Sequence, residues 1–171
     1  MLSLLAAVLL QQDVYAKPVK EHAFLKNFEG EWETTSKMLM GGPEPVVAKG
    51  KESSRLIAGG LFLITDMEAE IFGGTFVGHA TRCYDVHKKK FTGSWVDNMA
   101  TGVYTLEGTL DETGKVLTEW IEGANPQTGE PMKMKMTTTV KDKDSHTSRF
   151  FMTGPDGKEM EMGSVEYVRK K

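Results

Sequence analysis

The chain has 171 residues, of which 39% are hydrophobic and 26% charged, and this length and composition suit a single globular domain with its own apolar core. The formal net charge of -3 is small and mixed in sign, which argues against a nucleic-acid partner. Cys83 is the only cysteine, so an internal disulfide is excluded.

The first sixteen residues differ from the rest of the chain. An apolar run over residues 2–10 is followed by Val14, Tyr15 and Ala16, the small-x-small pattern of a signal-peptidase site. We therefore predict a signal peptide over residues 1–16 and a periplasmic or secreted protein, although basic residues before the run are missing. The alternative is an ordinary N-terminal segment of a cytoplasmic protein. The run is too short for a membrane span, which needs about 20 residues.

One short helix is predicted after Pro18. Phe24, Leu25 and Phe28 recur at three- and four-residue spacings, proline suits the first turn of a helix, and Gly30 suits its end. Beyond Gly30 the helical period is replaced by runs of alternating side chains.

Those runs predict ten strands. In the clearest one, Met132, Met134 and Met136 alternate with Lys133 and Lys135, so that one face is apolar and the other meets water. Nine breaks rich in Gly, Asn, Asp and Pro separate the strands, at residues 41–45, 58–60, 72–74, 85–90, 97–102, 111–114, 123–131, 141–145 and 154–157. A sheet with about ten hairpin-linked strands tends to curl, and closure removes its edges. We therefore predict an all-β fold, a closed antiparallel up-and-down β-barrel.

Four segments carry a resemblance to a known family: residues 21–33 (EHAFLKNFEGEWE), 82–99 (RCYDVHKKKFTGSWVDNM), 110–118 (LDETGKVLT) and 154–170 (GPDGKEMEMGSVEYVRK). They resemble the bacterial DUF1579 family, a domain of unknown function, which is similar to the calycins, the superfamily of lipocalins and fatty-acid-binding proteins. The resemblance implies a lipocalin-like barrel as a single domain over residues 17–171. It implies no catalytic residues.

Gly30 and Trp32 match the Gly-x-Trp of the first calycin strand. In such barrels this tryptophan closes one end, and an arginine from a late strand lies on its ring. The resemblance therefore implies a structural role for Gly30 and Trp32, with Arg149 or Arg169 as the cation-π partner.

A second Gly-x-Trp occurs in the segment FTGSWVDN. In a strand Phe91, Gly93, Trp95 and Asp97 share one face, so that an indole beside a carboxylate could orient a ligand at a pocket wall. The other interpretation is that Trp95 fills the core and Asp97 caps the following turn.

Signatures of metal sites and catalysis are missing. The four histidines have no metal-ligand spacing, so no metal or cofactor is expected. A haem would need an inward-facing histidine; His79 could serve if it faces inward, whereas His146 lies near a predicted turn. The sequence contains no Gly-x-Ser-x-Gly and no phosphate-binding glycine loop before a helix.

The favoured hypothesis is a non-catalytic barrel that binds a small, partly apolar ligand inside, among the methionines of the late strands. Its predicted contacts are Trp95, Asp97, Tyr104, Trp120 and His79. One alternative is an enzyme that uses carboxylates such as Asp66, Asp97 or Glu119, either as a pair or with His79. Another is a structural module whose filled barrel forms a homodimer through an outer face.

Overall fold

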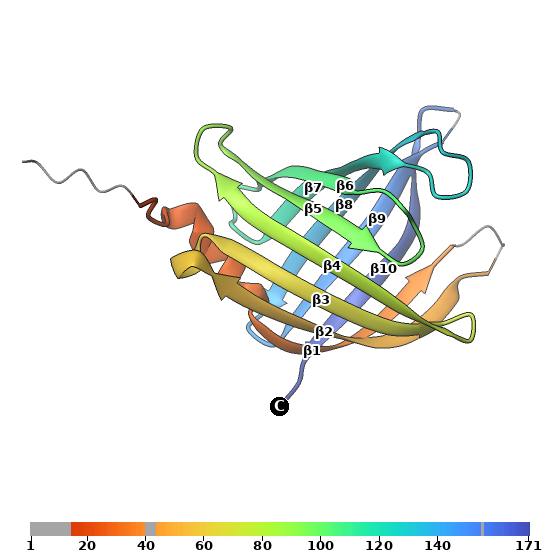
Figure 1. The fold of residues 1–171 in the computed structure, drawn as a ribbon, viewed down its shortest axis with the longest axis horizontal. Coiled ribbons are helices and arrows are strands. Elements are labelled where there is room, and N and C mark those ends of the chain that lie inside the picture. Colours follow the sequence, from red (N-terminus) through yellow and green to blue (C-terminus); the bar gives the residue numbers. More distant parts are fainter. Residues whose placement is uncertain (1–14, 40–43, 155) are drawn as a thin grey trace, which may run out of the picture.

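The chain folds into a closed β-barrel with a short helix at one end (Figure 1). The computed structural model describes residues 15–39, 44–154 and 156–171. The predicted signal peptide lies outside these residues except for its last two positions, and so does most of the predicted break at residues 41–45. The elements are η1 (Lys20–Phe28), β1 (Gly30–Met38), β2 (Val46–Ile57), η2 (Ala58–Gly60), β3 (Phe62–Ile71), β4 (Gly74–Asp85), β5 (Lys90–Asp97), β6 (Tyr104–Leu110), β7 (Val116–Ala124), β8 (Pro131–Asp142), β9 (Ser145–Thr153) and β10 (Glu159–Arg169).

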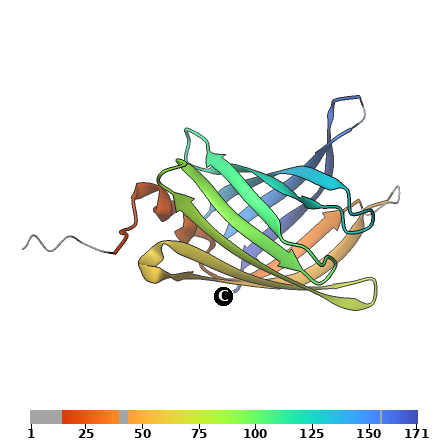
Figure 2. The ribbon, with the colours of Figure 1, turned by 45° about the horizontal axis from the view of Figure 1, so that its top comes forward.

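Each strand pairs antiparallel with its neighbour in sequence, and β10 pairs with β1 to close the ring. The predicted all-β, ten-stranded closed barrel with one N-terminal helix is therefore confirmed. The helix is a 3₁₀ helix of nine residues. Figures 1 and 2 show η1 at one end of the barrel and the β3–β4 and β5–β6 hairpins at the other. We call these the helix end and the hairpin end.

Helix η1 closes its end of the barrel with apolar side chains. Phe24, Leu25 and Phe28 are buried and form one core cluster with Leu63, Phe91 and Leu117. Among the residues that the structure describes, no helix is long and apolar enough to cross a membrane.

Trp32 packs beneath this helix as the resemblance implied. Its ring is 1% exposed, and its indole N–H donates to the carbonyl of Phe28 at 2.8 Å. Gly30 reaches a φ of 124°, which favours glycine, and a Cβ there would collide with the guanidinium of Arg169. That guanidinium lies 4.0 Å from the Trp32 ring centre. Arg149, the other candidate, faces outward and pairs with a carboxylate of β10. It alternates along β9 with Ser148 and Phe150, which face the cavity.

Candidate functional site

The interior of the barrel contains a cavity of about 410 Å³. Its wall is mostly apolar, and the methionines of β8 contribute to it as their alternation predicted. Its apolar lining residues include Met67, Leu106, Ile121, Met132, Met134, Met136, Phe150 and Val165.

The cavity runs along the barrel from the helix end to the hairpin end. At the helix end it is lined by Phe28 and Leu63, which are 5% and 1% exposed. At the hairpin end it is lined by Met99 and Pro126, both of which are exposed to solvent. The cavity therefore opens to solvent at the hairpin end, and Figure 2 shows that this end lies opposite η1.

Three of the predicted contact residues lie together on the cavity wall: Trp95, Asp97 and Tyr104. The indole N–H of Trp95 donates to Asp97 Oδ2 at 2.7 Å, and its ring stacks on Phe76 with a centroid distance of 6.3 Å. The other oxygen of Asp97 accepts the backbone N–H of Met99 at 2.8 Å. Asp97 therefore caps the turn, as one interpretation predicted, and it also fixes the orientation of Trp95, which lines the cavity. Burial and the nearby Asp97 raise the pKa of Tyr104.

Two strand glycines make room for these rings. A Cβ on Gly78 would overlap the ring of Trp95, and one on Gly123 would overlap the ring of Tyr104. A larger residue at either position would push the aromatic side chain into the cavity or out of its rotamer.

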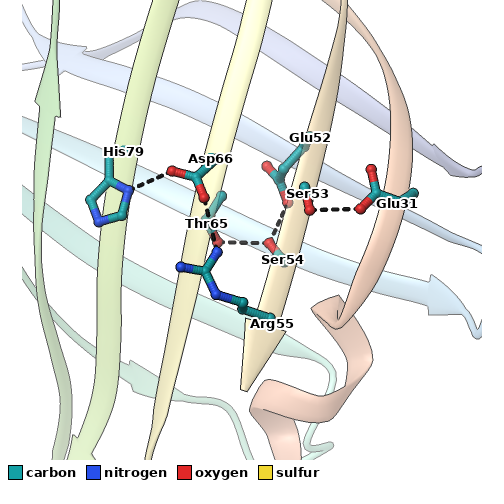
Figure 3. Close-up of polar contacts among 8 residues, drawn as sticks. All are labelled: Glu31, Glu52, Ser53, Ser54, Arg55, Thr65, Asp66 and His79. Carbon is teal, nitrogen blue, oxygen red and sulfur yellow. Dashed lines mark hydrogen bonds and ion pairs between the residues drawn. The ribbon is translucent and has the colours of Figure 1, made fainter. Parts of the chain in front are cut away.

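The structure corrects two of the predicted contacts, because both lie on the outer face. Trp120 is 38% exposed and lies beneath the ammonium of Lys133 at 4.8 Å. His79 Nδ1 lies 2.7 Å from Asp66 Oδ1, and the other oxygen of Asp66 accepts from Arg55 at 3.0 Å (Figure 3). The strand neighbours of Trp120 and His79 face inward, so the alternation of side chains turns both outward. His79, the histidine that could have served a haem, and Asp66 therefore both face away from the cavity.

A group of polar side chains lies around Glu52 and Arg82, at the inner part of the cavity, and Glu119 is the member of it that the enzyme hypothesis had named. Arg82 donates through Nε to Glu119 Oε1 at 2.8 Å, and Glu119 is fully buried. Glu52 lines the cavity and is 7% exposed. Its Oε1 accepts from the hydroxyl of Ser54 at 3.0 Å, and Ser54 also contacts Thr65 at 2.7 Å (Figure 3). Burial raises the pKa of the Glu52 carboxyl to about 7, although Ser54 and Arg82 act in the opposite direction.

His146 also faces inward, although the sequence had placed it too near a turn to do so. It is 3% exposed, stacks on Tyr167 at 4.1 Å and meets the ring of Trp32 edge to face at 4.5 Å. Burial, together with Arg169 and Arg82, lowers its pKa to about 3, so that the imidazole is neutral at physiological pH. Its Nδ1 has no hydrogen-bond partner among the residues that the structure describes.

A signal for Glu52 was present in the sequence. Along β2, Lys49, Lys51 and Arg55 occupy one face, which identifies that face as the outer one and leaves Glu52 on the inner face. Arg82 and Glu119 are 37 positions apart, and no local pattern links them. Within the described parts of the chain, no group of three or more His, Cys, Asp or Glu side chains could hold a metal ion.

The chain matches, over residues 17–169, the family described as "Protein of unknown function (DUF1579)". Its structure is similar to that of Rv2717c from M. tuberculosis, with a TM-score of 0.68 at 12% identity, covering 91% of this chain and 100% of that one. It is also similar to the S-type phycobiliprotein lyase CPES from Guillardia theta, with a TM-score of 0.60 at 11% identity, covering 87% and 92%. No curated protein sequence matches the chain. At these identities the likeness shows the fold, a calycin-like β-barrel, and nothing of the ligand.

Proposed function

This chain belongs to the DUF1579 family, a family of unknown function, and we propose that it binds a small, largely apolar molecule in the interior of its barrel. The observation that carries the proposal is the cavity of about 410 Å³. Side chains can fill the interior of a small barrel completely, whereas this volume falls in the range of about 300–1,000 Å³ that is typical of ligand pockets.

The chemistry of the wall supports the same proposal. Ligand pockets are lined mainly by apolar and aromatic side chains with a few polar groups that fix orientation. Here the methionines of β8 provide an adaptable surface, Trp95 and Tyr104 provide rigid aromatic surface, and Glu52 is a polar group at the inner part.

The two alternatives have less support. A carboxylate-based enzyme needs at least two free groups in the cavity, but Glu119 is paired with Arg82 and Asp97 is bonded to Trp95, which leaves Glu52. A structural module with a filled barrel conflicts with the volume of the cavity.

Binding of the neutral apolar dye Nile red, followed by its fluorescence, tests the proposal. Ala80 lines the cavity and pairs with Trp95 across strands, so Ala80→Phe fills the space where a ligand would lie. Val96 is 37% exposed on the outer face of β5, and Val96→Phe adds a ring there as the matched control. We expect Ala80→Phe to weaken dye binding about tenfold or more and Val96→Phe to leave it unchanged.

Circular dichroism would first establish that both variants retain the β-sheet spectrum of the parent protein. Failure of the parent protein to bind the dye, or an equal loss in the two variants, would contradict binding in the interior.

We further propose that the chain is exported and that its mature form is one domain over residues 17–171. The support is the apolar run and the small-x-small site within residues 1–16. Determination of the N-terminus of the protein made in its own host should identify Lys17 as the first residue, and retention of Met1 would contradict export by this route.

A further inference from the structure

Glu52 is a cavity-wall carboxyl whose charge the protein leaves largely uncompensated. It is 7% exposed and lines the cavity, and the hydrogen bond that it accepts comes from the hydroxyl of Ser54, a neutral group. Burying an ionised carboxylate without a cationic partner is costly, so such a group is rare inside a protein unless it serves a purpose.

The cation that acts on Glu52 is already paired with another acid. Arg82 is the guanidinium that acts electrostatically on Glu52, and its Nε donates to Glu119 at 2.8 Å. Glu119 has no exposed surface, and its second oxygen has no hydrogen-bond partner among the described residues. One positive charge therefore faces two carboxyl groups.

Within the described parts of the chain, the other ionisable groups that line this part of the cavity add no positive charge. Tyr167 faces it from β10, and burial, together with Glu52, raises the pKa of that phenol well above its usual range. His146 from β9 is neutral, because burial lowers its pKa to about 3. With Glu52 ionised, the inner part of the cavity carries a net negative charge in apolar surroundings.

A ligand can neutralise this charge or add to it. A carboxylate head would bring a third acid to one guanidinium, whereas an ammonium head would pair with Glu52 and donate hydrogen bonds to it.

We propose that the inner part of the cavity recognises the amine head of an amphiphilic ligand, with the Glu52 carboxylate as the acceptor and the methionine-rich wall around the apolar body. This inference rests on the proposed function, since it names the class of ligand for the same cavity.

Displacement of Nile red by three ligands that differ only in their heads tests the inference: decylamine, decanol and decanoate. At pH 7.5 we expect decylamine to displace the dye at a concentration about tenfold or more below that of decanol, with decanoate the weakest. The preference for decylamine over decanol should disappear in Glu52→Gln. It should persist in Glu33→Gln, which removes an exposed carboxylate from the neighbouring strand β1.

The outcomes separate the two proposals. If the three ligands displace the dye equally, or if decanoate is the strongest, the amine site is refuted while binding in the interior stands. If the preference for decylamine survives Glu52→Gln, the amine is recognised elsewhere and the assignment of Glu52 is wrong. If neither Nile red nor any of the three ligands binds to the protein, both proposals are refuted.

Discussion

The replacement of Glu52 by glutamine is expected to raise the free energy of unfolding at alkaline pH and to have little effect at acidic pH. Burial raises the pKa of this carboxyl from 4.5 to about 7 in the folded chain. Between these values the unfolded chain releases a proton that the folded chain retains, so stability is lost as the pH rises. The difference in pKa corresponds to about 3 kcal/mol, present below pH 4.5 and lost above pH 7.

Glutamine cannot ionise, and it keeps an oxygen that can accept from Ser54. Glu52→Gln should therefore be more stable than the parent protein by about 3 kcal/mol at pH 8, or about 6–12 °C in Tm, and nearly equal to it at pH 4. His146 titrates in the opposite sense, because its lowered pKa removes stability as the pH falls from 6.5 towards 3. Only the difference between variant and parent isolates Glu52.

Urea unfolding at pH 4, 6 and 8 measures this difference directly. The exposed Glu33→Gln variant serves as the control, and its effect should stay within about 0.5 kcal/mol at every pH. A gain for Glu52→Gln that is the same at pH 4 and pH 8 would refute the reasoning, since it would mean that Glu52 ionises equally in the folded and unfolded chains.

Two further predictions concern the closed end and the cavity wall. Arg169→Ala should lower the free energy of unfolding by about 3 kcal/mol in urea unfolding, because it removes a cation-π contact and three hydrogen bonds to backbone carbonyls. The exposed Arg149→Ala should cost less than about 1 kcal/mol, and equal costs would contradict the assignment of the cation-π partner. Trp95→Ala should weaken Nile red binding about tenfold, whereas Trp120→Ala on the outer face should leave it unchanged. Equal losses in these two variants would place the dye outside the barrel.

The fold was predictable because its signals are local. The alternation of Met132, Met134 and Met136 with lysines is typical of a strand with one buried face, and turn residues mark the ends of such strands. Which of Arg149 and Arg169 contacts Trp32 could not be predicted from a short segment of sequence. It depends on the register between β1 and β10, which sets Arg169 beside Trp32 and which no short segment encodes.

The candidate site was predictable only where one strand contains all of its parts. Trp95 and Asp97 are two positions apart, so their shared face followed from the strand period. Glu52 and Arg82 lie on different strands and become part of one wall only when β2, β3 and β4 pair in register. Polar residues in strands usually mark the solvent side, so the polarity of Glu52 or Arg82 taken alone predicts the wrong face. For Glu52 the lysines and the arginine on the other face of β2 correct that prediction.

We propose that the barrel interior is a binding site whose inner part recognises an amine. A crystal structure of the protein grown with decylamine tests it most directly. We predict that the alkyl chain lies in the cavity along the Met136 wall and that its nitrogen lies within hydrogen-bonding distance of the Glu52 carboxylate. An interior filled by side chains, or decylamine bound only on the outer surface, would contradict the claim.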